Sequence, residues 1–351
     1  EDFNYYGIYT SYQSNNSVQN NEIHRPLRST VSTFYGVYLT TGNEGSVIDG
    51  NRIHNGFTGA TTSTSAFYGI YVSSDGTSVS PNKLINNLIY NNEGNGTHYG
   101  IYNTSGEYMQ AYHNTIALDY TAATAGTTYG FYQTTSDVGI EFKNNIVYIT
   151  RGGSGIKYCI YKSTATTPIE SNYNVFYLGS AGSGAQNIGY QTSAQASLAN
   201  WQSTSSQDGA SIIADPLFSD PNSGNYLFTE SSMNDLATPV GVLKDIRGKD
   251  RSISTPDAGA YETVPVSGIE IQTDAIVSPS TVASGCYTNA ETITIRIRSN
   301  SIDPIDFSVN PVTITVNVTG ATTATYSTIV NAGTLSYNST DDFTVSVPSS
   351  S

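Results

Sequence analysis

The residues best suited to take part in a chemical reaction are two neighbouring side chains, Arg52 and His54. They are two positions apart, so in an extended strand they share one face. Histidine changes its protonation near neutral pH, which makes this pair a candidate for proton-transfer chemistry. His24 occupies the same position one sequence repeat earlier, and Arg25 and Arg28 follow it closely. The alternative interpretation is a solvated outer face with an incidental histidine pair.

Other catalytic patterns are missing from the sequence. The carboxylates of Asp49, Asp75, Asp119, Asp137 and Glu141 fall at different phases of the repeat. They therefore predict neither a calcium site nor the carboxylate pair of a glycosidase. No Gly-x-Ser-x-Gly, His-Glu-x-x-His or phosphate-loop motif occurs. We expect no metal site and no cofactor; calcium would be the first ion to consider, but no motif supports it.

The elements that must position these side chains are β-strands. The 351 residues include 27 tyrosines and 32 glycines, and only 12% are charged, which is typical of an all-β protein rich in turns. The net charge of −14 repels polyanions, and no basic cluster opposes it, so nucleic acid is not an expected partner. The sequence contains no apolar run of about 18 residues, so we expect no transmembrane segment.

A four-residue word, Tyr-Gly-Ile-Tyr with small variations, recurs six times at intervals of 29 to 33 residues. The copies begin at Tyr6, Tyr35, Tyr68, Tyr99, Tyr129 and Tyr158. A second word follows each copy after 15 to 19 residues and begins with an asparagine. These asparagines are Asn21, Asn51, Asn87, Asn114, Asn145 and Asn174. Two words that stay in phase through six copies indicate repeats of one structural unit.

Each word is too short to bury its own apolar face, and short words between turn residues do not form α-helices. If each strand stacks on its copy in the next coil, the backbone groups pair in parallel sheets. Successive coils would then rise by about 4.8 Å. We therefore predict an all-β fold in which residues 1–262 form a right-handed parallel β-helix.

Side chains alternate between the two faces of a strand. With Ile8 and its equivalents inside, the first tyrosine of each word is predicted to point inward, and the glycine and second tyrosine outward. The second tyrosines then form a stripe: Tyr9, Tyr38, Tyr71, Tyr102, Tyr132 and Tyr161. This stripe is either a stabilising ladder or a surface that binds sugars or proteins. The asparagine column is predicted to form a ladder of amide hydrogen bonds.

From about residue 195 the repeat fades into a segment with its own signature. Trp201 is followed by Asp-Pro-Leu-Phe at 215–218, Asn-Tyr-Leu at 225–227, Asp-Ile-Arg-Gly at 245–248 and Asp-Ala-Gly-Ala-Tyr-Glu at 257–262. This order resembles the closing segment, here about 195–262, of secreted right-handed β-helix proteins of Bacteroidota. Chondroitinase-B-like and alginate-lyase-like polysaccharide lyases share that architecture. The resemblance to a lyase implies a base, a charge-neutralising metal or arginine, and a groove.

The remainder of the chain has a different pattern. Residues 263–268 are predicted to be a linker. Beyond it, residues 291–298, 312–318 and 343–347 alternate apolar and polar side chains, which predicts an immunoglobulin-like β-sandwich over 269–351. This part resembles accessory domains of Bacteroidota surface proteins, which often use type IX secretion. We expect the sandwich to be incomplete and flanking domains of the same longer chain to adjoin it.

These observations favour a non-catalytic, extracellular protein, secreted or attached to the bacterial cell surface, that serves as an adhesin or structural spacer. The alternative is a polysaccharide lyase or glycan-binding module for acidic polysaccharides, which the resemblance and the Arg52/His54 pair support. An acidic chain with few basic residues is, however, a poor host for a polyanionic substrate. A third interpretation is a module that binds an assembly partner through a strand edge or the tyrosine stripe.

Overall fold

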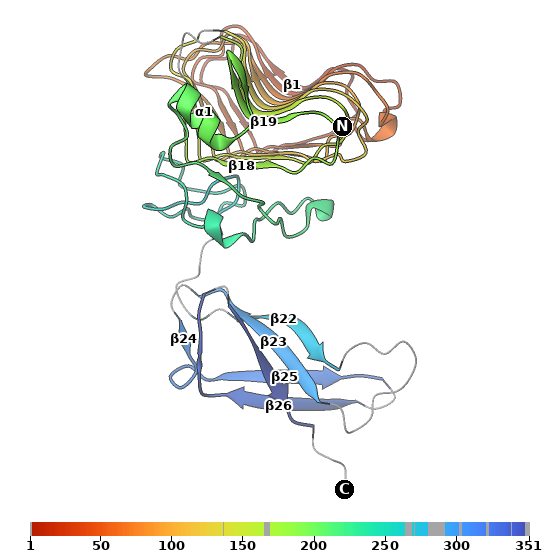
Figure 1. Cartoon of the computed structure of the whole chain (residues 1–351), viewed down its shortest axis with the longest axis vertical. Coiled ribbons are helices and arrows are strands. Elements are labelled where there is room, and N and C mark those ends of the chain that lie inside the picture. Colours follow the sequence, from red (N-terminus) through yellow and green to blue (C-terminus); the bar gives the residue numbers. More distant parts are fainter. Residues whose placement is uncertain are drawn as a thin grey trace. The chain divides into compact units, whose positions relative to one another are not determined.

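The computed structural model describes residues 2–135, 137–164, 169–263, 269, 271–279, 292–301, 304–320, 323–337 and 339–347. The chain divides into two compact units, Glu1–Thr263 and Val264–Ser351 (Figure 1). The first unit is a parallel β-helix whose three sheets contain eight, six and seven strands. Apart from Thr263, the predicted linker lies outside the described residues.

Each of the first six coils contributes one strand to each of the three sheets, and the last coil adds strands to sheets 1 and 3 only. Sheet 1 contains β1 (Tyr6–Thr10), β4 (Phe34–Leu39), β7 (Phe67–Val72), β10 (His98–Asn103), β13 (Thr128–Gln133), β16 (Lys157–Lys162), β19 (Gln186–Gln191) and β20 (Ser193–Gln195). Sheet 2 contains β2 (Ser17–Gln19), β5 (Val47–Asp49), β8 (Asn82–Ile85), β11 (Met109–Tyr112), β14 (Glu141–Lys143) and β17 (Glu170–Asn172). Sheet 3 contains β3 (Glu22–Ile23), β6 (Arg52–His54), β9 (Leu88–Tyr90), β12 (Thr115–Leu118), β15 (Ile146–Ile149), β18 (Val175–Leu178) and β21 (Ile212–Ile213).

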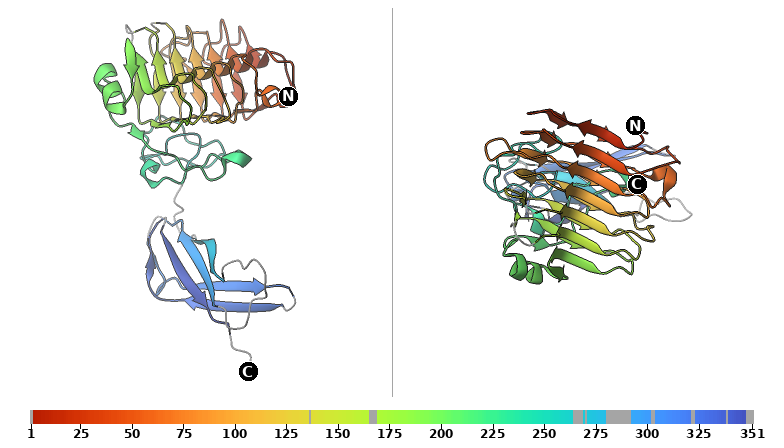
Figure 2. Two further views of the ribbon diagram at one scale, coloured as in Figure 1. Left: turned by 45° about the vertical axis from the view of Figure 1, so that its right-hand side comes forward. Right: turned by 90° about the horizontal axis from the view of Figure 1, so that it is seen from above.

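The repeat sets the register between coils. In sheet 1, for example, Tyr35 pairs with Tyr68 and Tyr38 pairs with Tyr71. The strands therefore stack copy on copy along the unit, as Figure 2 shows, and only β20 at the end runs antiparallel. The prediction of a parallel β-helix built from the two repeated words is confirmed.

The apolar core lies inside the coils, and it corrects one prediction about the Tyr-Gly-Ile-Tyr word. In β4, Gly36 and Val37 are both buried, whereas Tyr35 and Tyr38 are half-buried on the outside. A Cβ atom on Gly36 would lie 2.7 Å from Cγ2 of Ile53 in the core. The predictions that the first tyrosine points inward and the glycine outward were therefore wrong. Two successive inward residues break the strict alternation of a strand, so both tyrosines face outward.

The asparagine ladder is confirmed. The side-chain amide of each of the first five asparagines donates to the side-chain oxygen of the asparagine in the next coil, with N···O distances of 2.9 to 3.2 Å. The same oxygens also accept the backbone N–H of the preceding asparagine. Five of the six members are completely buried: Asn51, Asn87, Asn114, Asn145 and Asn174. Buried amides need such partners, so this ladder satisfies an interior polar column.

The last coil is covered by the helix α1 (Leu198–Ser205). Gly189 takes the place that Ile160 has in the preceding coil. A Cβ atom at this glycine would lie 2.1 Å from Cε3 of Trp201, so the missing side chain makes room for the indole. Trp201 is only 1% exposed and closes the end of the core.

After the cap, the chain returns along the outside of sheet 3. This closing segment includes the short helical turns η2 (Pro221–Ser223) and η3 (Ser231–Met233). Its residues Tyr226, Ala260 and Tyr261 pack on Leu88 and the neighbouring outward side chains of sheet 3. The segment therefore covers an outer face of the β-helix as well as following its last coil. A further turn, η1 (Thr58–Ala60), interrupts an earlier coil.

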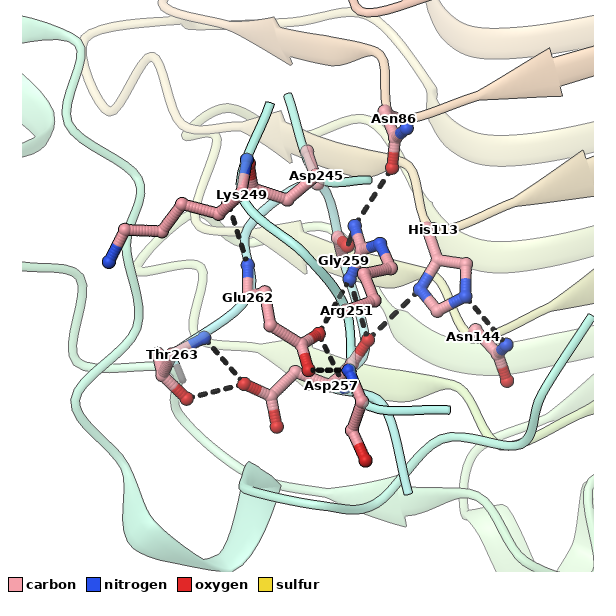
Figure 3. A network of polar contacts seen from close by, with 12 residues as sticks. Asn86, His113, Asn144, Asp245, Lys249, Arg251, Asp257, Gly259, Glu262 and Thr263 are labelled. Atoms are coloured by element: carbon pink, nitrogen blue, oxygen red, sulfur yellow. Dashed lines mark hydrogen bonds and ion pairs between the residues drawn. The ribbon is translucent and has the colours of Figure 1, made fainter. Parts of the chain in front are cut away.

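A buried polar network fastens this segment to the coils (Figure 3). Nη1 of Arg251 lies 3.0 Å from Oε2 of Glu262. Nη2 of the same arginine donates to Oδ1 of Asn86 at 2.8 Å. His113 contacts the carbonyl oxygen of Asp257 through Nδ1 at 2.9 Å. The contacts of Arg251 with Asn86 and of His113 with Asp257 join residues more than 140 positions apart and fix the path of the segment.

The second unit consists of small antiparallel sheets. They are formed by β22 (Ile271–Ser278), β23 (Ile293–Ser299) and β28 (Thr340–Val345), by β24 (Ile305–Asp306) with β27 (Thr334–Leu335), and by β25 (Val312–Val318) with β26 (Ala324–Val330). In β23 the isoleucines at alternate positions are buried, together with Phe307 and Val345. The alternating pattern in the sequence thus marks a strand with one core-facing side.

Candidate functional site

The structure brings the two predicted histidines together on the outside of sheet 3. The rings of His24 and His54 stack with centroids 5.1 Å apart and planes at 7°. Tyr90 stacks on the other side of His54 at 4.6 Å. Nε2 of His54 lies 3.0 Å from Oε1 of Glu22, and Nδ1 contacts Oδ1 of Asn55. Both ring nitrogens of His54 are therefore engaged, and the side chain is largely buried.

Arg52 is tied to the closing segment. Its Nη1 donates to the hydroxyl of Tyr261 at 3.2 Å, and the guanidinium lies 6.0 Å from the centre of that ring. Arg25 does not join the group, because its guanidinium is buried and donates to the carbonyl oxygens of Asn4 and Gly56. Arg52, His24 and His54 are thus neighbours, but the contacts around them are those of a packed interface.

Two columns of tyrosines cover the outer face of sheet 1; we call them the tyrosine face. The first column contains Tyr6, Tyr35, Tyr68, Tyr99, Tyr129 and Tyr158, and the second contains Tyr9, Tyr38, Tyr71, Tyr102, Tyr132, Tyr161 and Tyr190. Within the first column, consecutive rings from Tyr35 onward stack 4.7 to 5.6 Å apart, with planes within 9°. From Tyr102 onward the second column stacks similarly at 4.3 to 5.1 Å. The tyrosine ladder is therefore confirmed, and it is double.

This stacking determines what the tyrosine face presents to solvent. Interior rings have their faces against rings of neighbouring coils, and the columns meet edge to face, as between Tyr99 and Tyr132 at 88°. Burial, reinforced by the neighbouring phenols, raises the pKa of Tyr71 to about 12. The tyrosines in the middle of each column expose mainly ring edges and neutral hydroxyls, because the faces of their rings are stacked on neighbouring rings. The predicted binding role of the outward column remains a prediction.

Sheet 2 carries a row of interacting charges on its outer face. Nζ of Lys143 lies 2.7 Å from Oε2 of Glu141 and 2.5 Å from Oε1 of Glu170 in the next coil. Tyr112 donates its hydroxyl to the same Oε2 of Glu141 at 2.7 Å. Burial alone would raise the pKa of Glu141, but the hydrogen bonds from Lys143 and Tyr112 outweigh it, so that pKa is lowered. Lys143 is therefore held between the carboxylates of Glu141 and Glu170.

A pocket of about 530 Å³ opens beside this row. It is formed by the ends of β14 and β17, by the loop that follows α1, and by residues 238–240 of the closing segment. Lys143, Glu170, Asn172, Tyr173, Gln207 and Thr238 are among its lining residues. Sequence reasoning did not find this pocket. Its walls come from four segments spread between residues 143 and 240, and no repeated motif marks them.

Other buried ionisable side chains form hydrogen bonds with the backbone inside the β-helix. Burial lowers the pKa of His98 to about 3, and the nearby Arg151 adds to the effect, so the imidazole stays neutral. Nη2 of Arg151 donates to the carbonyl oxygens of Gly94 and Gly96 at 2.6 and 3.0 Å. These side chains satisfy backbone carbonyls of the turns. Within the described ranges, no group of three or more His, Cys, Asp or Glu side chains is arranged to hold a metal ion.

Among the residues that the structure places, no helix has the length and apolar character needed to cross a membrane. Comparison of the chain with family models, with curated proteins and with solved structures found no match.

Proposed function

We propose that this chain is a non-catalytic module of a secreted or cell-surface protein, in which the β-helix acts as a rigid scaffold of the adhesin or spacer type. The observation that carries the proposal is that the candidate catalytic residues, Arg52 and His54, already bond to other protein groups. His54 has both ring nitrogens bonded, and Tyr261 of the closing segment contacts Arg52. A base and a charge-neutralising arginine must be reachable by substrate, and this pair is packed against protein.

The interior supports the role of a scaffold. Parallel pairing, the asparagine ladder and the double tyrosine ladder each connect one coil to the next without interruption. Local opening of one coil must break all three sets of contacts together, so we expect the unit to be stiff. A stiff repeat with a capped end suits a protein that holds binding parts at a fixed distance from a surface.

The second unit fits this proposal as an immunoglobulin-like module. Its central strand β23 pairs antiparallel with β22 and β28 and presents alternate isoleucines to a core. Arg296 and Asp342 form a bidentate ion pair on the opposite, outer side, with N···O distances of 2.7 and 2.9 Å. Such one-sided strands are those that a β-sandwich requires.

The alternative, a polysaccharide lyase, is the function that the test must separate from the scaffold. The full chain is incubated with alginate, pectate, chondroitin and heparin in the presence of calcium, and formation of unsaturated uronate is followed by absorbance. We expect no rise above that of buffer. A rise that is lost in the Arg52→Ala/His54→Ala double variant, but kept in Lys83→Ala on sheet 2, would replace the scaffold proposal with a lyase.

A further inference from the structure

We propose that the pocket beside Lys143 binds a neutral saccharide. The pocket has a volume of about 530 Å³ and lies between the last strands of sheet 2, the loop after α1 and the closing segment. A concave site with a few fixed polar groups is the usual form of a small-ligand site. The residues that decide the ligand are Asn172, Tyr173 and Gln207, together with the charged pair Lys143 and Glu170.

Two side-chain amides in the wall are oriented by the backbone. Oδ1 of Asn172 accepts the N–H groups of Tyr173 and Ala210 at 3.0 and 2.8 Å. Oε1 of Gln207 accepts the N–H of Ser171 at 3.1 Å. Because only the oxygen of an amide accepts, these bonds fix which end of each side chain carries the NH₂ group. Neither NH₂ group has a partner within the described residues, so two pre-oriented donors are available to a ligand.

Tyr173 supplies an aromatic surface that the tyrosine face lacks. Its ring is half-buried and makes no contact with another aromatic ring among the described residues. The backbone of this residue is left-handed, with φ of 57°, as at the equivalent positions Asn86, His113 and Asn144 of earlier coils. The electron-rich face of a free ring attracts the weakly positive C–H groups of a pyranose. An unstacked ring beside two amide donors is therefore suited to a sugar.

The charges select against an acidic sugar. Lys143 is already shared between Glu141 and Glu170, so the row as a whole carries one net negative charge. The side chain of Glu170 is 65% exposed and retains acceptor capacity for ligand hydroxyls. A uronate would meet this charge and the chain's overall charge of −14. A neutral saccharide can accept from the two amides and donate to Glu170 without that repulsion.

The test is calorimetric titration of the full chain with neutral hexasaccharides of β-1,3-glucan, β-1,4-glucan, α-1,4-glucan and mannan, and with an oligogalacturonate as the anionic arm. We expect at least one neutral saccharide to bind and the oligogalacturonate not to bind. Tyr173→Ala should lower the affinity at least tenfold for the saccharide that binds. Asn172→Asp and Gln207→Glu should do the same, since each keeps the structural acceptor oxygen but replaces the donor NH₂ group with a carboxylate oxygen.

Tyr12→Ala is the matched control. Tyr12 is also a left-handed tyrosine, with φ of 54°, and it is 76% exposed in the first coil, far from the pocket along the β-helix. Its replacement should leave the affinity unchanged. The proposal is overturned if no neutral saccharide binds, if only the oligogalacturonate binds, or if binding survives in Tyr173→Ala and Asn172→Asp. The scaffold proposal has a separate readout, unsaturated product, and does not depend on this result.

Discussion

The indole Nε1 of Trp201 donates a 2.7 Å hydrogen bond to the carboxylate of Asp208. The other oxygen of that carboxylate accepts the amide of Asn174, the last member of the asparagine ladder, at 3.0 Å. One buried acidic side chain therefore joins the helical cap to the column that runs through every coil. The hydroxyls of Ser171 and Ser211 also donate to it, so its charge is balanced by four donors.

Replacing Asp208 with alanine should therefore loosen the cap. It leaves the Trp201 indole and the Asn174 amide without their acceptor in the interior, and each buried orphan donor costs about 1–3 kcal/mol. We expect the free energy of unfolding of the β-helix to fall by about 3 kcal/mol or more, measured by urea denaturation. Asp250→Ala, which removes a carboxylate that is 82% exposed, should change it by less than about 1 kcal/mol. Equal effects of the two variants would contradict a role of Asp208 in the cap.

The glycine of the repeated word should not tolerate a side chain. A Cβ atom on Gly100 would lie 2.3 Å from Cγ2 of Ile116 and 2.6 Å from the carbonyl oxygen of Gly130. Gly100→Ala is therefore expected to destabilise the β-helix by about 1–3 kcal/mol through overpacking, as a lower midpoint of thermal unfolding. Gly209, where an added Cβ would meet no atom within 4 Å, provides the control, and Gly209→Ala should be neutral or slightly stabilising.

The tyrosine face should make stability sensitive to alkaline pH. Burial raises the pKa of Tyr71 and of Tyr161 to about 12, with help from neighbouring phenols. In the unfolded chain a tyrosine ionises at a pH of about 10. The stabilisation is thus complete below pH of about 10 and is lost as pH rises toward about 12, because the unfolded state releases its protons first.

Urea midpoints recorded from pH of about 8 to about 12 measure this loss. Tyr71→Phe removes one of these ionisable groups while keeping its ring, so its midpoint should fall less steeply with pH than that of the parent. Tyr12→Phe, outside the two columns, should follow the parent. A midpoint that is independent of pH over this interval would contradict the argument.

The closing segment should depend on its buried ion pair. Arg251 is fully buried, and its partner Glu262 is 4% exposed at the side chain. Arg251→Met leaves an uncompensated buried carboxylate, which costs about 3–5 kcal/mol. We expect the segment to become a site of limited proteolysis while the coils stay protected. Lys244→Met removes one member of an exposed pair, with Lys244 57% exposed, and should leave the digestion pattern unchanged.

The fold of the coils was largely predictable from the sequence, because in a parallel β-helix equivalent positions of successive repeats pair with one another. Asn87 and Asn114 can pair only if the strands that carry them are adjacent, and the spacing of the words supplied that adjacency. The orientation of the first tyrosine was not predictable from alternation. Gly36 and Val37 both face the core, and only the packing of Ile53 against the glycine shows that the alternation is broken there.

The sequence by itself determined the repeat, the parallel stacking, the asparagine column and the outward second column of tyrosines, because these features depend on local periodicity. Only the tertiary structure decided which functional groups are reachable. The return of the closing segment over sheet 3 places Tyr261 on Arg52 and, at residues 238–240, completes a pocket around Asn172 and Tyr173. No repeating pattern in the sequence predicts contacts between segments so far apart, since these contacts depend on where a non-repeating segment packs.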